Sequence, residues 1–499
     1  MSLPIRGVLA VILALARVAH AAPDVPDAHV DELRLDAVIA VAVRQSPDLE
    51  RARIDADLAR AQLLRAEGSE DTHLGARAQG ALVHASPTDP SSSSDSEAVT
   101  VLASRTLPTG GTLGVSATGD RLNIATVALD ANKKAVAAVI SRYSAGVAVQ
   151  LTQPLLRGAG ATAFEAPIRQ AARQRDAAAL TREAKARDLM VSLVQAYWEV
   201  AFAWQQLEVR RASLDLARQQ LDYTQRAIRA EKVAESEVLA VEEAIATRKQ
   251  DVIAAEQLLY DQSLALRQLA GLEIGPEAIL VKTEALPPKV NAPELEMAAV
   301  VRAAFEHSAE LAALEASRHA AEIGEAAADN AAKSKLDLDL SAGPVGAAAT
   351  PGKALSSLAL HPGYTITGSL TLDHTIERRT ERGGQGVAHS AVLTAKITER
   401  DARARLAVRA TRAVQRMKAA LASIDLGTEA IGLAEQNVTA EQRRFELGKS
   451  TNFDVLRRQD ELEQARLRHA TAVSDYLIAR ADLDGLTGEI LGRYGIVMP

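Results

Sequence analysis

The sequence predicts a mainly α-helical protein with a small β part, built from two copies of one long antiparallel helical hairpin. Three observations support this prediction. An apolar residue recurs at every seventh position through two long segments, both segments return 217 residues later, and shorter segments with period-two alternation precede each copy. Aromatic residues form only 3% of the 499 residues, so thin layers of Ala, Leu and Val fit this chain better than a thick core.

Composition excludes several classes of function. The net charge of −7 at pH 7 argues against a nucleic-acid partner. The chain has no cysteine, so a disulfide framework, a thiolate metal site and a cysteine nucleophile are excluded. The sequence also shows no nucleophile–base pair and no metal-ligand spacing, and we therefore expect neither an enzyme nor a cofactor or metal site.

The N-terminal residues have the pattern of a secretory signal. One positive charge within residues 1–6 is followed by an apolar run over residues 7–16 and by the small-x-small cleavage site Ala19-His20-Ala21. We expect a signal peptide at residues 1–21 and a mature chain outside the cytoplasm, with a buried N-terminal helix as the alternative. No later segment reaches the about 18–20 continuous apolar residues of a membrane helix, so membrane insertion would use strands.

Two structural repeats are expected, over residues 22–290 and 291–499. Each begins with an amphipathic helix, continues with strands and ends with a long helical hairpin. The first amphipathic helix covers residues 33–66 and is interrupted at Ser46-Pro47. The other expected segments are residues 295–328 for the second amphipathic helix, about 73–153 and 335–375 for the strands, and about 163–271 and 378–487 for the hairpins.

The strands alternate apolar with polar or small residues over about 9–11 residues, which is typical of transmembrane barrel strands. The clearest begin at Tyr143 and Tyr364, where each tyrosine would stand at the membrane interface. Residues 99–107 and 113–119 are expected to form a further hairpin around a Pro-Thr-Gly-Gly turn. Helices that leave and return to one side of a membrane need an even number of strands between them, so two or four belong to the first repeat. The edge of a soluble β-sandwich is the alternative.

Four to six strands are too few to close a barrel within one chain, because about eight are needed, so we expect an oligomer. Residues 84–97 and 343–363 are rich in Pro, Ser, Gly and Ala and are expected to be exposed loops. The run Gly383-Gly384-Gln385-Gly386 lacks the Lys-Ser/Thr of a phosphate loop and is interpreted as a helix interruption.

The heptad repeats define the long helices, the first of which runs from about Ala163 to Ala230 and would be about 100 Å long. His469 alone departs from the apolar pattern, and we interpret it as an interfacial or pore-facing residue rather than a metal ligand. The seam residues are Leu193, Val200, Leu207, Leu214, Leu221 and Ile228, then Val238, Ile245, Val252, Leu259 and Leu266 in the first copy, and Ala410, Met417, Ile424, Ile431, Val438 and Phe445, then Val455, Leu462, His469, Tyr476 and Leu483 in the second.

Three segments resemble the outer-membrane efflux protein family, the TolC-like channels. They are residues 151–158 (LTQPLLRG), residues 196–199 (AYWE) and residues 445–456 (FELGKSTNFDVL). The resemblance extends over nearly the whole expected mature chain and includes the duplication. It implies a homotrimer whose strands form a transmembrane β-barrel in the outer membrane of a Gram-negative bacterium, continued by an α-barrel tunnel in the periplasm.

The resemblance further implies a passive exit duct of a tripartite efflux or type I secretion system. Its partners would be a periplasmic adaptor protein, an inner-membrane transporter and outer-membrane lipid. A periplasmic adaptor and a secreted coiled-coil scaffold are the alternatives. An adaptor should show one hairpin flanked by compact domains, and a scaffold would have no reason for paired strands of membrane length.

The resemblance also places functional residues at the two helix–helix turns. Glu237 and Asp454 match the acidic residues that ring the constricted entrance, and Arg457 would pair with one of them as a latch. Alternatively, both acids are first-turn carboxylates that complement the helix dipole. Glu231 stands where the family usually has glycine. The adaptor-contacting positions are Lys232, Val233, Leu447, Gly448 and Lys449. Tyr197 and Trp198 are interpreted as packing residues.

Overall fold

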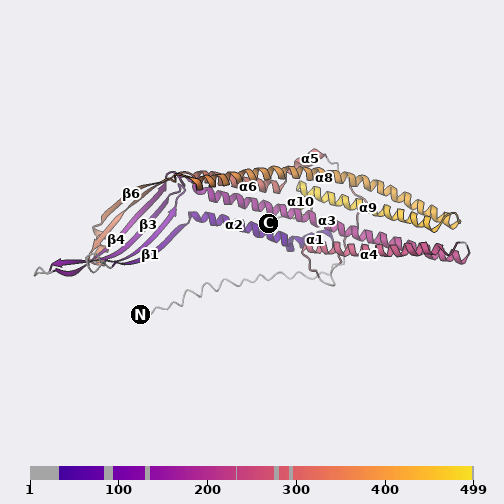
Figure 1. Ribbon diagram of the computed structural model, residues 1–499, viewed down its shortest axis with the longest axis horizontal. Coiled ribbons are helices and arrows are strands. Elements are labelled where there is room, and N and C mark those ends of the chain that lie inside the picture. The colour runs from indigo at the N-terminus through magenta and orange to yellow at the C-terminus, as the bar shows by residue number, and fades with distance from the viewer. Residues whose placement is uncertain are drawn as a thin grey trace, which may run out of the picture.

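A computed structural model describes residues 33–83, 94–129, 135–231, 233–274, 280–291 and 296–496. The molecule is elongated, with a β-sheet at one end and two long helical hairpins that run to the other end (Figure 1). The predicted fold class, mainly α with a small β part and duplicated long hairpins, is confirmed. The expected signal peptide lies outside the described residues. In the part of the chain that the structure describes, no helix combines the length and apolar character needed to cross a membrane.

The hairpins consist of one very long and one shorter helix each. Helices α3 (Ala161–Arg229) and α8 (Arg379–Glu446) contain 69 and 68 residues, and they are followed by α4 (Glu237–Ala270) and α9 (Asn452–Thr487). The heptad seams explain these lengths, because each seam buries its apolar residues continuously against neighbouring helices. The buried seam residues include Leu193, Val200, Leu207, Leu259, Leu266, Ala410, Met417, Val455, Leu462 and Tyr476.

His469 is half-buried between α8 and α9, as its interpretation as an interfacial residue requires. It lies opposite Gly427 of α8, where an added Cβ would come within 3.2 Å of the imidazole. The missing side chain of Gly427 therefore provides the space that His469 takes in the seam. At this level of the α8–α9 seam, the pair of Gly427 and His469 takes the place of two aliphatic side chains.

Shorter helices flank the long ones. In the first half, α1 (Leu35–Gln45) and α2 (Pro47–Glu67) are separated at Ser46, as predicted, and the 3-10 turn η1 (Gly68–Glu70) leads into the sheet. In the second half, α5 (Met297–Glu306) and α6 (Ala309–Ala331) are separated at Ser308, whose hydroxyl accepts the Leu311 amide at 3.2 Å. A short helix, α10 (Glu489–Arg493), follows α9.

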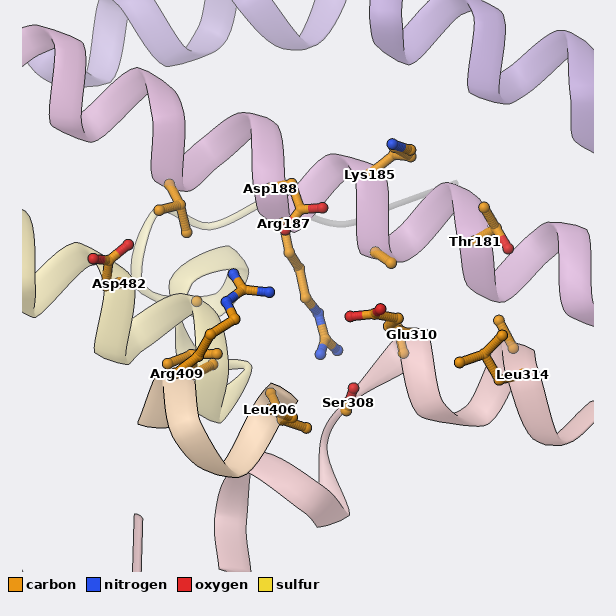
Figure 2. A pocket seen from close by; sticks show the side chains of 16 residues that line it. Thr181, Lys185, Arg187, Asp188, Ser308, Glu310, Leu314, Leu406, Arg409 and Asp482 are labelled. Carbon is orange, nitrogen blue, oxygen red and sulfur yellow. The ribbon is translucent and has the colours of Figure 1, made fainter. Parts of the chain in front are cut away.

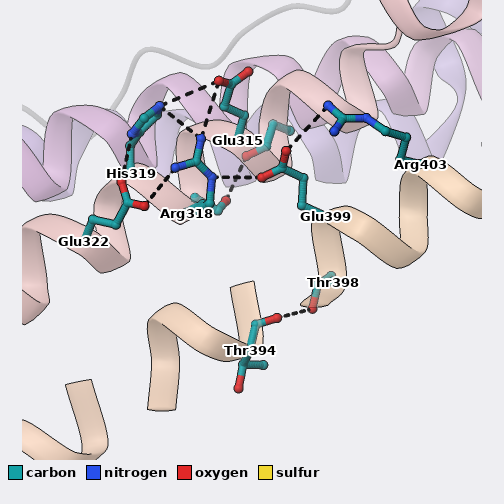
Figure 3. A network of polar contacts seen from close by, with 10 residues as sticks. Glu315, Arg318, His319, Glu322, Thr394, Thr398, Glu399 and Arg403 are labelled. Atoms are coloured by element: carbon teal, nitrogen blue, oxygen red, sulfur yellow. Dashed lines mark hydrogen bonds and ion pairs between the residues drawn. The ribbon is translucent and has the colours of Figure 1, made fainter. Parts of the chain in front are cut away.

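A charged cluster fastens α6 along α8 (Figure 3). Arg318 of α6 donates to Glu322 on its own helix and to Glu399 of α8, both at 2.8 Å. Arg403 lies 3.6 Å from the second oxygen of Glu399, and His319 contacts Glu322 at 3.2 Å. The hydrogen bond from Arg318 lowers the pKa of Glu322, so this carboxylate stays charged. The charge-assisted bond from Arg318 to Glu399 joins α6 to α8.

Over the described residues, the sheet has six antiparallel strands in chain order. Four strands lie between α2 and α3, which is an even number as predicted, and two lie between α6 and α8. The further hairpin belongs to the sheet, since its strands pair with each other and with the strands on either side. The strands are β1 (Thr72–Val83), β2 (Ser94–Thr106), β3 (Thr112–Leu129), β4 (Ala135–Pro154), β5 (Lys335–Ala348) and β6 (Gly363–Asp373).

The central strands are longer than the sequence indicated. β3 continues to Leu129 and β4 begins at Ala135, eight residues before Tyr143. These two strands pair with each other beyond the ends of their neighbours. A two-stranded extension does not need one apolar and one polar face, so the alternation that marks the rest of the strands gives no signal there. The loop expected at residues 84–97 is also too long, because β2 already begins at Ser94.

The exposed loop expected at residues 343–363 is wrong. β5 extends to Ala348, and α7 (Pro351–Leu360) follows, with its proline in the first turn where no amide donor is required. α7 packs on β4 and β5, and a Cβ on Gly346 would meet the Ala354 carbonyl oxygen at 2.4 Å. Glycine at this position lets the helix lie directly on the sheet.

The helix interruption expected at residues 383–386 is also wrong, since α8 runs through these residues without a break. A glycine inside a helix costs only about 1 kcal/mol relative to alanine, and tertiary contacts offset this cost. Gln385, which lies among the glycines, donates to Asp329 of α6 at 2.8 Å. Contact with α6 therefore maintains a helix whose local sequence is unfavourable.

An extended segment, residues 280–291, crosses the middle of the helical body. The Tyr197 hydroxyl of α3 accepts the Glu284 amide at 3.0 Å and donates to the Leu33 carbonyl at 3.1 Å. Trp204 donates to the Val281 carbonyl at 2.9 Å. Tyr197 is completely buried and its ring meets Trp198 edge to face at 5.3 Å, so the interpretation of these aromatics as packing residues is confirmed.

Candidate functional site

The sheet has one apolar and one polar face. Residues that stand opposite each other in an antiparallel register point to the same side, so the register assigns every strand position to a face. The apolar face carries many large aliphatic side chains that are exposed in the single chain. Its members are Leu74, Ala76 and Ala78 of β1, Ala103, Val101 and Val99 of β2, Leu113, Val115 and Ala117 of β3, Val147, Val149 and Leu151 of β4, Leu336, Leu338, Leu340 and Ala342 of β5, and Tyr364, Ile366, Leu370 and Leu372 of β6.

The opposite face carries polar and small residues that hydrogen-bond across the strands. Ser144 donates to Asp120 at 2.5 Å, and the Gln150 amide donates to Ser116 at 3.3 Å. Closer to the helices, Thr152 donates to Asp339 at 2.7 Å. The sheet therefore suits a position between an apolar medium on one side and water on the other.

A polar row ends the apolar face on the side away from the helices. Glu97, Arg121 and Tyr143 stand side by side in the register, with Arg121 3.7 Å from Glu97 and 5.8 Å from the centre of the Tyr143 ring. Tyr364, the second predicted interface aromatic, is 79% exposed near the far end of β6. Both tyrosines thus belong to the apolar face near its far boundary, where a tyrosine presents a ring to lipid and a hydroxyl to water.

The two helix–helix turns lie at the end of the molecule opposite the sheet (Figure 1). Glu231 in the first turn has φ 56° and Gly448, the equivalent residue 217 positions later, has φ 67°. Both residues are therefore in the left-handed region, although only glycine adopts it without steric cost. Glu231 therefore keeps the turn geometry that glycine would give, but its Cβ makes this backbone conformation sterically strained.

The expected adaptor-contacting residues are distributed unequally between the turns. Leu447 is 70% exposed, and Gly448 and Lys449 beside it are also exposed. Val233 in the first turn is half-buried, and Lys232 lies outside the described residues. Phe453, at the start of α9, is 66% exposed. The second turn thus presents the larger apolar surface, while the first turn has Ala230 and Ser236 at the positions equivalent to Leu447 and Phe453.

Glu237 and Asp454 both lie in the first turn of their helices, α4 and α9. Asp454 completes a capping box: its carboxylate accepts the Thr451 amide at 3.2 Å, and its own amide donates to the Thr451 hydroxyl at 3.3 Å. Hydrogen bonds from Thr451 and Ser450 lower the pKa of Asp454, so this carboxylate is ionised. Glu237 accepts the Asn452 amide of α9 at 3.3 Å and so joins the two hairpins.

Arg457 does not form the expected latch within the chain. Its Nε lies 3.4 Å from Glu461 on the same helix, and its side chain is 64% exposed. An exposed pair of this kind contributes little free energy. The structure instead brings together a set of mostly buried polar residues that extends along the hairpins from Asn452 near the tip and links α9 to α3 and α4.

Arg248 of α4 is the centre of this set, which we call the inter-hairpin network. Its guanidinium is 5% exposed and donates to Asp460 of α9 at 2.7 Å, to Gln459 of α9 at 3.1 Å and to the Ser213 carbonyl of α3 at 3.0 Å. Three helices therefore share the charge of Arg248, which is buried, while the Asp460 carboxylate that faces it is 58% exposed.

Two further groups extend the network along the helices. Arg210 of α3 bonds to Asp251 of α4 at 3.1 Å and also contacts Glu463 of α9, which accepts the Ser213 hydroxyl. Nearer the tip, Asn452 accepts the Gln220 amide at 2.7 Å and the Thr224 hydroxyl at 3.0 Å. The inter-hairpin network comprises Arg210, Ser213, Gln220, Thr224, Arg248, Asp251, Asn452, Gln459, Asp460 and Glu463.

Sequence reasoning missed this network, but a signal was present. Arg248 follows Ile245 by three residues, which is the place in the heptad where a second apolar residue is normal. A charged residue inside an apolar stripe of a helical hairpin indicates a partner on a facing helix. The partners on α9 cannot be read from the sequence, because nothing in it fixes how far one hairpin slides along the other.

A cavity of about 430 Å³ lies between α3, α6, α8 and α9 in the middle of the body (Figure 2). Its charged lining is mixed, with Arg187 extending from α3 toward Ser308 and Glu310. Arg187 bonds to the His307 carbonyl and to Glu183, so its charge serves to hold α5 and α6 against α3. Burial raises the pKa of Asp482, whose carboxylate accepts the Gln195 amide at 2.6 Å. The residues around this cavity hold the helices together, and they do not have the arrangement of a catalytic centre.

No protein-family model and no curated protein matches this sequence. Solved structures do match it. The outer membrane protein VceC from Vibrio cholerae is 16% identical with a TM-score of 0.66, over 91% of this chain and 96% of that one. The CmeC outer membrane channel of Campylobacter jejuni is 12% identical with a TM-score of 0.67, over 91% and 85%. The MtrE outer membrane channel of Neisseria gonorrhoeae, in its open state, is 15% identical with a TM-score of 0.60, over 92% and 89%.

This chain has the fold of those TolC-like outer membrane channels. The likeness covers the sheet and the helical body together, so it accounts for the whole architecture and not for one hairpin alone. The predicted resemblance is confirmed at the level of the fold.

Proposed function

We propose that this protein is the outer-membrane channel of a tripartite efflux or type I secretion system, through which cargo leaves the cell passively. The two-faced sheet carries the proposal. From Leu336 to Pro344, which pairs with Tyr364, the apolar face of β5 extends about 27 Å along the strand. At the usual tilt of about 40° this corresponds to a height of about 21 Å, which approaches the about 25 Å apolar band of outer-membrane barrels.

The fold supports the same position in the cell. The long helices continue from the sheet on one side only, so a sheet in the outer membrane would place them in the periplasm (Figure 1). Within the described part of the chain, the six strands leave β1 and β6 as open edges, which neighbouring chains would cover. In the proposed homotrimer, three sheets close into one barrel surrounded by lipid, and the six long-helix pairs form the tunnel wall.

The two turns would form the periplasmic mouth. Lys232, Val233, Leu447, Gly448 and Lys449 are proposed to contact a periplasmic adaptor, which joins the channel to an inner-membrane transporter. Three copies of Glu237 and of Asp454 would ring the mouth with negative charge. We assign the closure of the mouth within each chain to the inter-hairpin network, while Arg457 is available for a contact with a neighbouring chain.

The decisive experiment is fractionation of cells that express the full chain. We expect the protein in outer-membrane fractions, heat-modifiable migration on gels and cross-linked products up to the size of a trimer. Recovery as a soluble monomer from a gently lysed cell would contradict the proposal. A Leu338→Asp/Leu370→Asp variant, which places charges on the apolar face at paired positions, should not reach the membrane, whereas Ser369→Asp on the polar face is the matched control.

A further inference from the structure

The extra hairpin β2–β3 has the two-faced pattern of a wall strand pair. On the apolar side, Val99 and Val101 of β2 stand opposite Gly119 and Ala117 of β3. On the other side, Thr100 stands opposite Thr118. A hairpin that covered the mouth of a pore, or projected into water, would have no need for an apolar face of this kind.

The same hairpin is tied into the sheet along both edges. β2 pairs with β1 from Ser94 to Arg105, and β3 pairs with β4 from Thr112 to Leu129. The apolar rows continue across these junctions without a change of face: Leu74, Ala103, Val115 and Val149 stand in one row from β1 to β4. Moving β2–β3 out of the sheet would break both ladders and leave their buried-edge hydrogen bonds unpaired.

We propose that β2 and β3 are structural strands of the channel wall, so that the assembled protein ends in a barrel of eighteen strands with a wide, polar-lined exit that does not select among small solutes. This inference rests on the proposed trimeric channel. With strands about 4.8 Å apart and tilted by about 40°, eighteen strands give a backbone diameter of about 36 Å, compared with about 24 Å for twelve.

The width has a consequence for cargo. Side chains that fill the centre of small barrels cannot meet across a barrel of this size, which leaves an aqueous channel, as in barrels of about 16–18 strands. The polar face of the added hairpin contributes Ser104, Thr100, Ser116 and Thr118 to this channel wall. Small molecules and extended or helical polypeptides would pass alike, so selection would take place at the helical end.

The test is the strand count in a cryo-electron microscopy map of the full chain purified in lipid nanodiscs. We expect a trimer with eighteen strands. A trimer with twelve strands and a displaced β2–β3 would overturn this inference and leave the proposed function standing. A protein without a trimer or without membrane strands would overturn the proposed function itself.

A deletion variant gives a functional readout. Removing residues 94–129 takes out β2 and β3 and keeps an even, antiparallel strand order. In planar bilayers, neutral polymers added on the strand side should enter the wild-type exit up to a clearly larger size than the exit of the deletion variant. Equal size limits for two folded trimers would contradict a wall position for the hairpin. If the deletion variant does not assemble, the strand count of the wild type decides alone.

Discussion

At the scale of single residues, the clearest local conflict is at the first turn. Glu231 adopts the left-handed conformation that Gly448 adopts in the equivalent turn. The left-handed conformation raises the free energy of a residue that has a side chain by about 1–2 kcal/mol, whereas glycine adopts it at almost no cost. The two turns therefore solve the same geometric problem with residues of different intrinsic cost.

We expect Glu231→Gly to stabilise the folded chain by about 1 kcal/mol, because it removes the left-handed strain. Gly448→Ala is the matched control and should destabilise it by a similar amount. Thermal unfolding of the purified protein, followed by circular dichroism, should show a higher Tm for the first variant and a lower Tm for the second. A Tm for Glu231→Gly at or below that of the wild type would contradict the strain at Glu231.

The proposed closure of the periplasmic mouth gives a second prediction at the scale of single residues. Arg248 is buried among three helices, whereas Arg457 is exposed beside Glu461. Hydrogen bonds to charged groups contribute about 1.5–3 kcal/mol when their partners are shielded from water, and exposed ion pairs contribute about 0–1 kcal/mol. Arg248→Ala should therefore loosen the tie between the hairpins and raise the single-channel conductance, and cells should become more sensitive to a large antibiotic.

Arg457→Ala is the control for this prediction. Unchanged conductance for Arg457→Ala, together with increased conductance for Arg248→Ala, would place the latch in the inter-hairpin network. The reverse result would return the latch to Arg457, acting between neighbouring chains. Asp460→Asn, which removes the charge opposite Arg248 and keeps the shape of the side chain, should give an intermediate conductance.

At the scale of the elements, Tyr197 shows how the middle of the body is held. Burial raises its pKa from 10.0 to about 12, with the nearby Glu284 carboxylate acting in the same direction. The neutral phenol is thus favoured in the folded state. Its contribution is fully present below pH 10, where the unfolded phenol ionises, and is lost as the pH rises from 10 to 12, by up to about 3 kcal/mol.

Tyr197→Phe removes the hydroxyl that bridges the Leu33 carbonyl and the Glu284 amide. We expect this variant to be about 1–3 kcal/mol less stable at pH 7, because a buried amide and a carbonyl lose their partner. The difference from the wild type should shrink between pH 10 and pH 12. Chemical unfolding of both proteins at a series of pH values measures this difference, and a gap that is independent of pH would refute the role of the phenol.

The element scale also shows what the sequence can and cannot predict. The long helices and the two-faced strands were predictable, because a heptad or a period of two repeats the same physical requirement many times. The extended ends of β3 and β4, helix α7 and the glycines within α8 were not predictable. Each depends on a contact with a distant segment, such as Gly346 with α7 or Gln385 with Asp329.

The candidate site divides in the same way. Glu237 and Asp454 were identified from their places in the first turns and from a resemblance, and the structure puts them at the tip. Two of the partners of Arg248, Gln459 and Asp460, lie more than two hundred residues away on α9. No local pattern in the sequence encodes how far α9 is displaced along α4. The structure was therefore required to move the proposed latch from Arg457 to the inter-hairpin network.

At the scale of the whole molecule, a single chain leaves surfaces uncovered that other chains or lipid would normally cover. Much of the apolar face of the sheet is exposed, and both outer strands, β1 and β6, have an edge without a partner strand among the residues that the structure describes. Because the number of strands is even, β1 runs away from the helices and β6 runs back toward them. β6 of one chain can therefore pair antiparallel with β1 of the next, and repetition of this heterologous contact either closes a ring or produces an open polymer.

The absence of cysteine from the sequence allows a direct test of this contact. Ala76→Cys on β1, combined in turn with Ile366→Cys, Gly368→Cys or Leu370→Cys on β6, introduces the only two thiols of the chain. Neighbouring strands bring Cβ atoms to about 4.5–5.5 Å, which is compatible with a disulfide. We expect at least one combination to give dimers and trimers on non-reducing gels, with a ladder that ends at three, because a closed ring offers no further edge. Each single variant should give at most a dimer, and a ladder that continues beyond three would show that the sheets do not close as a trimer.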